Sequence, residues 1–380
     1  MLVRQRGPID VSSTGTAATP GGPAPENTAP ENTAPENTAP ENTAPENTVA
    51  RTTVAGVDMG DAELAAAVAQ GLDRVEALLR SELGSGEPFV AEIALHLVNA
   101  GGKRYRPLVT LLCAQLGPDP SSEDAVKAAA VTELIHLATL YHDDVMDEAT
   151  MRRGAVSANA RWDNSAAILT GDFLFAHASR LVSELGPDAV RIIAETFAEL
   201  VQGQMRETVG ARDDDPVEHY LTVAAEKTAS LIATAGRYGG MFSGADDEQV
   251  QRLDRLWRAV GTAFQIADDI IDISSASVDS GKTPGTDLRE GVHTLPVLFA
   301  LTDTGPDADR LRVLLDGPVT DDDELAEALE LLRRSPGMAR AQATLDRYTA
   351  AAHAELVLLP DLPARAALQR LVDYTVARTA

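Results

Sequence analysis

The chain has 380 residues, of which 44% are hydrophobic, and these values suit a globular protein with one large domain or two ordinary ones. Its formal net charge of −26, from 58 Asp and Glu against 32 Lys and Arg residues, argues against nonspecific binding to nucleic acids or anionic membranes. The one cysteine, Cys113, excludes an internal disulfide, and the sequence contains neither a secretory signal nor an apolar run of membrane-spanning length, so we expect a soluble cytoplasmic protein.

Residues 1–60 differ in composition from the rest of the chain. Residues 24–48 are five tandem copies of APENT, a repeat with one proline and no Val, Ile, Leu or aromatic side chain. Proline removes a backbone donor and disfavours helix in the residue before it, and nothing apolar offsets the entropy lost on ordering. We therefore predict a disordered tail over 1–60, either a partner-binding arm or a dispensable solvated extension. Met59 is an alternative start.

From residue 61 onward the sequence predicts one helix after another. The stretch 61–83 places Leu64, Val68 and Leu72 on one helical face, at steps of four residues. Gly, Pro and Asp cluster at the breaks between the helices, and no segment alternates like a strand. We expect a single all-α bundle over 61–380. Its further predicted helices are 89–98, 104–116, 122–150, 163–184, 188–210, 217–242, 246–274, 293–303, 307–315, 322–334, 338–357 and 361–378.

The segment HDDVMD at 142–147 contains the first unusual group of acids. Helical spacing places His136, Asp143 and Asp147 on one face, with Asp144 one step round the helix. Carboxylates this close repel one another unless a cation lies among them. The segment therefore indicates a cation site.

A second group repeats this spacing in FQIADDIID. Gln265, Asp268, Asp269 and Asp272 lie at i, i+3, i+4 and i+7 on an otherwise apolar helix, where buried unpaired charges are costly. Oxygen ligands without histidine or cysteine favour Mg²⁺ over zinc. One DDxxD pattern is common on exposed helix ends, but two such patterns on apolar helices favour a metal site.

Two other acidic runs have an ordinary explanation. We expect 213–215 and 321–323, each three successive aspartates, to be solvated loops or helix N-caps.

Cationic residues gather in four short segments. Each alone is typical of a solvated surface, but together they fit two phosphate sites, one bridged to the aspartates by metal and one held by arginine and lysine alone. No GxSxG elbow, Cys–His pair or P-loop is present, which favours metal-assisted departure of a diphosphate from an apolar substrate. The segments hold Lys103, Arg104 and Arg106 after two glycines, Arg152 and Arg153, Lys227 beside Thr228, and Lys282 in a glycine-rich loop.

These motifs, in this order, resemble the trans-isoprenyl diphosphate synthases, most closely the long-chain polyprenyl diphosphate synthases. The resemblance covers the chain from about residue 61 to its end and rests on GGKRYRP, HDDVMDEATMRRG, GDFLFAHA, KTASL, FQIADDIID and GKTPGTDLREGVHTLP. It implies a helical bundle of the isoprenoid-synthase type with a central cavity, and a homodimer. It also implies head-to-tail condensation of isopentenyl diphosphate with an allylic diphosphate.

The resemblance further implies a role for each matching residue. The metals and cations would stabilise the leaving diphosphate as an allylic carbocation forms, and the isopentenyl double bond would attack that carbon. Mg²⁺ on the allylic diphosphate would be held by the six aspartates, which are also counted as catalytic: Asp143, Asp144, Asp147, Asp268, Asp269 and Asp272. The same diphosphate would be bound by Arg152, Lys227, Thr228, Gln265 and Lys282, and Lys227 is also counted as catalytic. Isopentenyl diphosphate would be bound by Lys103, Arg106, His136 and Arg153.

Product length is predicted from the residues one turn before Asp143. The growing tail should pass Ala138 and Thr139, and in the family a small residue there opens a deeper tunnel. Ala138 therefore favours a long product, heptaprenyl to nonaprenyl, as for a quinone side chain. Tyr141 is nearby but points elsewhere on the helical wheel.

Two departures and four alternatives accompany the resemblance. Val292 stands where the family often has lysine, and GQMRE replaces the common GExxQ around Gln204. The alternatives are a short-chain geranylgeranyl diphosphate synthase, a class I terpene cyclase, a non-catalytic partner subunit and a di-metal carboxylate bundle. The two intact DDxxD patterns disfavour the cyclase and the partner subunit, and the lack of suitable Glu-x-x-His pairs disfavours the bundle.

Overall fold

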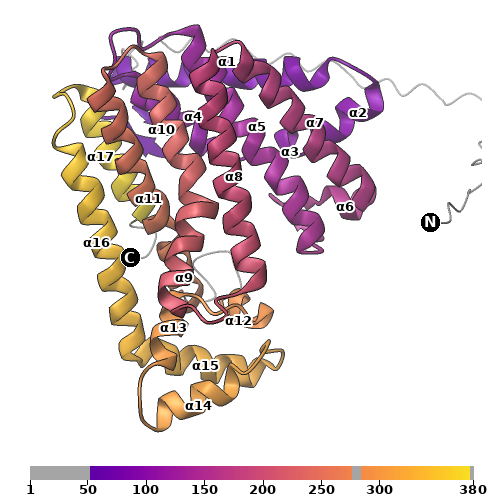
Figure 1. The fold of residues 1–380 in the computed structure, drawn as a ribbon, viewed down its shortest axis with the longest axis vertical. Coiled ribbons are helices and arrows are strands. Elements are labelled where there is room, and N and C mark those ends of the chain that lie inside the picture. Colours follow the sequence, from indigo (N-terminus) through magenta and orange to yellow (C-terminus); the bar gives the residue numbers. More distant parts are fainter. Residues whose placement is uncertain (1–51, 276–283, 377–380) are drawn as a thin grey trace, which may run out of the picture. The chain divides into compact units, whose positions relative to one another are not determined.

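The computed structural model describes residues 52–275 and 284–376, which belong to a folded unit running from Ala50 to Ala380. The predicted tail up to residue 51 and Lys282 lie outside the described residues. Helices dominate the described part, and the predicted all-α class is confirmed (Figure 1). None of the helices described is both long and apolar enough to cross a lipid bilayer.

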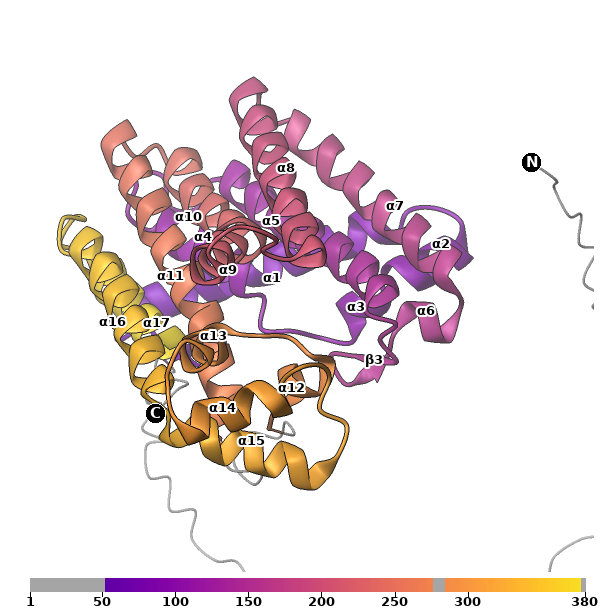
Figure 2. The same ribbon diagram turned by 60° about the horizontal axis from the view of Figure 1, so that its bottom comes forward.

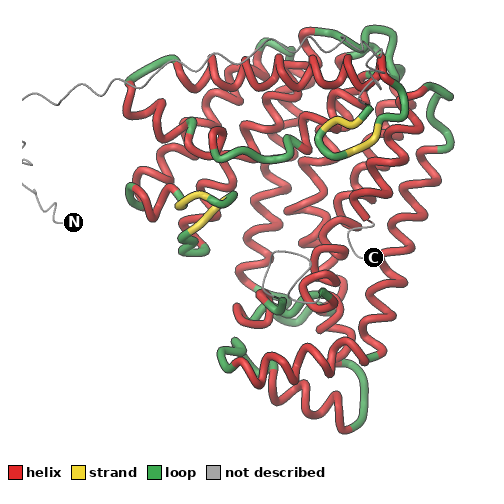
Figure 3. Tube along the Cα trace, turned by 180° about the vertical axis from the view of Figure 1, so that it is seen from behind, coloured by secondary structure: helices red, strands yellow, loops and turns green. Residues whose placement is uncertain are grey.

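The helices follow the predicted ranges closely, with a few differences. The range 122–150 ends early, 217–242 contains a π-helical turn, and two short antiparallel hairpins were not predicted (Figure 3). The elements are β1 (Thr53–Val54), β2 (Val57–Asp58), α1 (Ala62–Gly84), α2 (Pro88–Ala94), α3 (His96–Asn99), α4 (Tyr105–Ala114), α5 (Glu123–Met146), β3 (Met151–Arg152), β4 (Ala155–Val156), α6 (Ala158–Arg161), α7 (Asn164–Ser183), α8 (Pro187–Val209), α9 (Pro216–Val223), the π-helix η1 (Ala224–Ala229), α10 (Ser230–Phe242), α11 (Asp247–Ser274), α12 (Thr286–Glu290), α13 (Leu295–Leu301), α14 (Pro306–Leu314), α15 (Asp322–Arg334), α16 (Pro336–Leu356) and α17 (Pro363–Val376).

Several helix starts are fixed by acidic caps. Asp215 accepts hydrogen bonds from the amides of Val217 and Glu218 at the start of α9, and Asp321 caps α15 in the same way. The prediction that these two acidic runs contain helix N-caps is confirmed. Asp215 and Asp321 thus have a structural role as helix caps.

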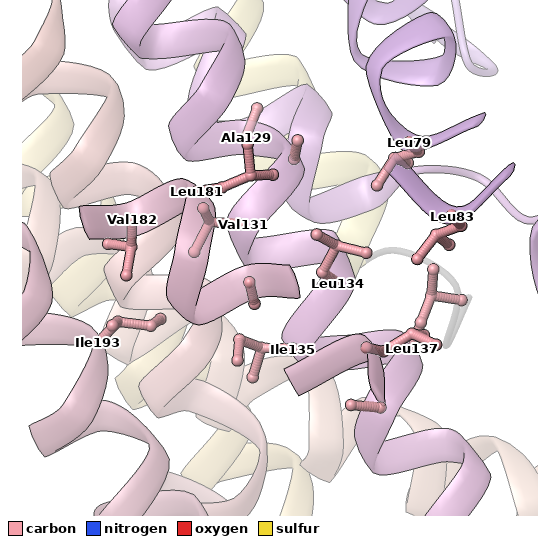
Figure 4. Packing of buried hydrophobic residues seen from close by; sticks show 14 of the residues in the cluster. Leu79, Leu83, Ala129, Val131, Leu134, Ile135, Leu137, Leu181, Val182 and Ile193 are labelled. Atoms are coloured by element: carbon pink, nitrogen blue, oxygen red, sulfur yellow. The ribbon is translucent and has the colours of Figure 1, made fainter. Parts of the chain in front are cut away.

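Helix α5 lies within the larger hydrophobic cluster and packs on α1, α4, α7 and α10. Figure 4 shows Leu134 and Leu137 of α5 near Leu79 and Leu83 of α1. Burying each large apolar side chain stabilises the fold by about 1.5–3 kcal/mol. This packing fixes the helix whose last turns carry the first aspartate cluster.

Helix α11 carries the second aspartate cluster and packs on α10 and α16. Figures 1 and 2 show α8, α10, α11 and α16 running alongside one another, with α14 and α15 gathered at one end. Gly239 of α10 lies so close to α4 that a Cβ there would come 2.3 Å from the carbonyl oxygen of Thr110. Helix α10 therefore joins α4 and α5 on one side to α11 on the other.

Residues 53–58 lie within the predicted tail, yet they form a short hairpin that packs on the folded unit. Ala55 and Gly56, both with positive φ, connect β1 to β2, and Val57 and Met59 are buried in a core cluster that includes α17. Arg370 of α17 donates a hydrogen bond to the carbonyl of Asp58 at 2.7 Å. The paired segments are too short for a periodic signal, so composition assigned them to the tail. A chain started at Met59 would lack this hairpin.

Candidate active site

The first aspartate cluster lies at the carboxyl end of α5. Asp144 is buried, Asp143 is half-buried and Asp147 is exposed at the helix C-cap. Arg152 of β3 contacts Asp144 at 2.5 Å and Asp147 at 3.8 Å. The dipole of a helix disfavours negative charge at its carboxyl end, so the cluster favours a nearby cation.

The pKa values of the aspartates in this cluster also indicate a need for a nearby cation. Burial raises the pKa of Asp143 to about 6, although the charge of Lys227 opposes the shift. Burial also raises the pKa of Asp144, against the hydrogen bond from Arg152. Among the described residues, the Oδ2 atom of Asp144 is buried and accepts no hydrogen bond. Its unused acceptor suits a metal ion.

The second cluster has a different set of partners. Asp269 of α11 is buried and accepts hydrogen bonds from the Tyr220 hydroxyl at 2.5 Å and the Gln265 amide at 3.0 Å. Gln265 in turn accepts one from the Thr228 hydroxyl at 3.0 Å. Burial raises the pKa of Asp269 to about 8, and the Tyr220 hydrogen bond opposes this. The structure thus brings three predicted residues into one chain of hydrogen bonds.

The other two aspartates of this cluster lie one turn apart on α11. Asp272 accepts hydrogen bonds at 3.2 Å from the amides of Thr286 and Asp287, at the start of α12. Asp268 is half-buried. The cluster is therefore tied both to α9, through Tyr220, and to α12.

Lys227 and Thr228 lie on the π-helix η1 between α9 and α10. Such turns are rare and occur frequently at functional sites. Lys227 forms an ion pair with Glu207 of α8, and Gln204 donates a hydrogen bond to Glu207 at 3.1 Å. The GQMRE segment, which departs from the family pattern, therefore contacts a predicted site lysine.

A cavity of about 1120 Å³ joins the two clusters. Predicted residues from both line it: Asp147, Lys227, Thr228, Gln265 and Asp269. Glu207, Tyr220, Asp287 and His293 also line it and were not predicted. Within 52–275 and 284–376, no three His, Cys, Asp or Glu side chains converge as a metal site by themselves.

A basic group lies at the start of α4 and on α5. Burial lowers the pKa of Arg106 to about 10, with Glu133 opposing, and its buried Nε atom has no hydrogen-bond partner in the part of the chain described. Burial, then the charges of Arg106 and Arg153, lowers the pKa of His136 well below its ordinary value. The structure thus brings these three predicted residues together. Lys103 is exposed and donates a hydrogen bond to Tyr374 of α17 at 3.0 Å.

Of the two residues predicted to set product length, Ala138 lies in the core and Thr139 is half-buried. Ala138 is buried within the same cluster as Leu134, and the Thr139 hydroxyl donates a hydrogen bond to the His136 carbonyl at 2.9 Å. Neither is among the described residues that line the 1120 Å³ cavity. Tyr141 points away, as expected, because its hydroxyl donates a hydrogen bond to the Ile93 carbonyl at 2.5 Å.

Known proteins resemble this chain over nearly all of the folded unit. Residues 87–332 match the model of the family described as polyprenyl synthetase. The nonaprenyl diphosphate synthase of Mycobacterium tuberculosis is 65% identical over 324 residues, which cover 85% of this chain and 97% of that one. Heptaprenyl diphosphate synthase component 2 of Geobacillus stearothermophilus is 40% identical over 81% of this chain and 94% of its own. The crystal structure of geranylgeranyl pyrophosphate synthase from Corynebacterium glutamicum, complexed with calcium and isoprenyl diphosphate, is 53% identical with a TM-score of 0.78, covering 84% of this chain and 99% of that one.

Proposed function

The chain belongs to the polyprenyl synthetase family and is a prenyltransferase, and we propose that it condenses isopentenyl diphosphate head to tail with an allylic diphosphate. The product is a long-chain all-trans polyprenyl diphosphate. One arrangement carries the proposal: two aspartate clusters contribute to the same cavity, and a half-buried basic group lies near His136 of α5 and the start of α4. The acidic clusters suit a diphosphate that is bound through metal ions, and the basic group suits a second diphosphate that is bound directly.

The family depends on divalent metal, and we assign Mg²⁺ to the two clusters. Asp143, Asp144 and Asp147 would hold it on one side, and Asp268, Asp269 and Asp272 on the other. Bound metal supplies charge neutralisation for the departing diphosphate. The unused buried oxygen of Asp144, and the raised pKa values of Asp143 and Asp269, fit this donor set because each carboxylate needs a positive partner.

A set of cationic and polar residues, three of which line the cavity, orients the allylic diphosphate. Arg152, Lys227, Thr228 and Gln265 donate to its oxygens, and Lys282, outside the described residues, is assigned to the same group. Lys227 exchanges its contact with Glu207 for a phosphate oxygen. As the C–O bond breaks, these donors stabilise the charge that develops on the leaving diphosphate.

The basic group holds isopentenyl diphosphate. Arg106 has a buried Nε–H that no acceptor among the described residues satisfies, His136 is neutral and can donate one N–H, and Lys103 and Arg153 add positive charge. The isopentenyl double bond attacks the allylic carbon, a carbon–carbon bond forms, and the proton lost from the adjacent carbon passes to the departed diphosphate. This accounts for the lack of an obvious protein base in the motifs.

We assign a product of heptaprenyl to nonaprenyl length, suited to a quinone side chain. The small Ala138 and the 65% identity to a nonaprenyl synthase support this length. A geranylgeranyl product is the second candidate, because the Corynebacterium synthase is 53% identical. Purified protein with Mg²⁺, isopentenyl diphosphate and farnesyl diphosphate should yield a narrow set of long products by mass spectrometry. Geranylgeranyl diphosphate as the terminal product would overturn the length, and no elongation from any allylic primer would overturn the reaction.

We also propose a cytoplasmic homodimer with a non-catalytic N-terminal tail. Exposed apolar side chains on α2, on α7 and in the chain between them support self-association: Phe89, Met146, Met151, Val156 and Leu169. The similarity to a component of a heptaprenyl diphosphate synthase keeps a two-component assembly as the alternative. Light scattering of the purified chain, combined with its activity alone, separates the two. An inactive monomer would favour the two-component assembly.

A further inference from the structure

A buried carboxylate without an assigned role lies behind the basic group. Glu133 is on α5, ten residues before Asp143, and is 1% exposed. Its Oε1 atom lies 3.5 Å from Nη1 of Arg104 and 3.7 Å from Nη2 of Arg153. A buried acid is costly unless it is paired, so its position between two guanidinium groups has a structural consequence.

Arg104 connects Glu133 to the glycine loop before α4. It has a left-handed backbone, with φ of 47°, and donates to the carbonyls of Val98 at 3.0 Å and Gly101 at 3.1 Å. Its Nε atom also contacts Glu76 of α1 at 3.0 Å. All these partners are protein atoms. Arg104 is therefore fixed inside the protein, unlike its neighbour Arg106, whose Nε–H has no partner among the described residues.

Arg153 fixes the same loop from the other side. It donates to the Gly101 carbonyl at 2.7 Å and the Leu97 carbonyl at 3.1 Å. Gly102 has a φ of +133°, and a Cβ there would come within 2.9 Å of the Arg153 Cζ atom. Glycine at this position thus lets Arg153 reach the loop, and Arg153 and Arg104 hold it from two sides.

The guanidinium groups of Arg104, Arg106 and Arg153 lie close enough for their positive charges to repel one another. Glu133 supplies the negative charge on their buried side, and its charge also favours the protonated forms of Arg106 and Arg153. Without it, the repulsion would push the arginines and the loop apart toward solvent. The side facing solvent remains available to a ligand because Gly102 and Lys103 are exposed there.

We propose that Glu133 is a positioning residue for isopentenyl diphosphate: paired with Arg104 and Arg153, it holds the loop 101–104 in the conformation that presents Arg106 to the diphosphate. The inference rests on the proposed function and deepens it. Glu133 touches neither substrate and acts only through the arginines. Its removal therefore affects the isopentenyl site and not the allylic site, which lies beyond Asp143.

The test compares Glu133→Gln with a matched change, Glu82→Gln. Glu82 is also a little-exposed acid of the bundle that pairs with a basic residue, Arg180, but it contacts none of the basic group. Steady-state kinetics should give Glu133→Gln a KM for isopentenyl diphosphate raised about tenfold or more, with the KM for farnesyl diphosphate unchanged within about twofold. Glu82→Gln should change neither KM.

Calorimetric titration of isopentenyl diphosphate separates the possible failures. Loss of affinity in Glu133→Gln matching the rise in KM supports the positioning role. Equal rises in both KM values, or a lowered thermal midpoint with unchanged KM values, would show a merely structural role and overturn the inference alone. No binding and no elongation by the wild-type chain would overturn the proposed function and the inference together. If Glu133→Gln fails to fold, Arg104→Lys is the second variant. It keeps the positive charge but loses the several N–H donors of the guanidinium group, and it should also raise the KM for isopentenyl diphosphate.

Discussion

The two aspartate clusters share one spacing but have different surroundings. At the end of α5, Asp144 is paired with an arginine and keeps one buried oxygen without a hydrogen bond among the described residues. At the end of α11, Asp269 is held by a tyrosine and an amide, and Asp272 by two backbone amides. The α5 cluster is thus prepared for an added cation, whereas much of the α11 cluster is oriented by protein donors. Identical motifs therefore imply different sensitivities to substitution.

The largest effect should come from the α5 cluster. Asp143→Asn should lower kcat by about a thousandfold, because a carboxylate at a metal-assisted leaving group is removed. The pKa of Asp143 is raised in the folded protein but has its ordinary value in the unfolded chain. At neutral pH the Asp143 carboxylate is charged in both states, so its charge destabilises the metal-free fold. The metal-free variant should therefore unfold at an equal or higher temperature than the wild type. Mg²⁺ with inorganic pyrophosphate should stabilise the wild type much more than the variant, as measured by thermal denaturation; equal stabilisation would contradict the assignment.

The next effect probes the hydrogen bonds of the α11 cluster. Tyr220→Phe removes one of the two donors to buried Asp269 and should lower kcat by about tenfold to a hundredfold, as expected for a residue that orients a metal ligand. Tyr238→Phe is the matched control, because its buried hydroxyl donates to the Ala189 carbonyl in the core. Both variants should lose stability in thermal denaturation. Only Tyr220→Phe should lose kcat, and an equal loss in both would show that Asp269 needs no such support.

Sequence patterns predicted the part of the site that depends on local spacing. Apolar periodicity located α5 and α11, and the DDxxD spacing located their carboxylates. The partners of those carboxylates are distant in the chain: Tyr220 lies 49 residues before Asp269. Such a contact leaves no periodic signal in one sequence, because it is created when α9 packs beside the site.

Other features escaped prediction for related reasons. Glu133 lies in an apolar stretch of α5, where a single acid gives no motif, and its importance comes from arginines brought in by two separate loops. The π-helical turn under Lys227 has no recognised sequence signature. The predicted tunnel residue Ala138 was placed correctly on its helix, but helical geometry alone does not show whether neighbouring helices leave a channel beside it.

A smaller effect is expected at Lys227, which lines the cavity and whose charge acts on Asp143. Glu207 pairs with Lys227 and also raises the pKa of Asp143, so it competes with a diphosphate for the lysine. Glu207→Gln should lower the KM for the allylic diphosphate by about threefold, because a surface ion pair contributes at most about 1 kcal/mol. Glu226→Gln, which breaks a similar pair with Arg206, is the control. A raised KM in Glu207→Gln would instead make Glu207 a necessary orienting group for Lys227.

The smallest effect on catalysis should come from the N-terminal hairpin, which lies outside both clusters. A chain that starts at residue 52 keeps β1 and β2, whereas a chain that starts at Met59 loses the burial of Val54 and Val57 against the core cluster that includes α17. The second chain should be less stable by about 3–6 kcal/mol, the contribution of two buried valines at about 1.5–3 kcal/mol each. Its kcat at low temperature should match that of the first chain, because the hairpin contacts neither aspartate cluster. Urea denaturation of the two truncated chains measures the difference directly. Equal stabilities would mean that the hairpin is only an ordered end of the tail, and the boundary predicted at residue 60 would then be the functional one.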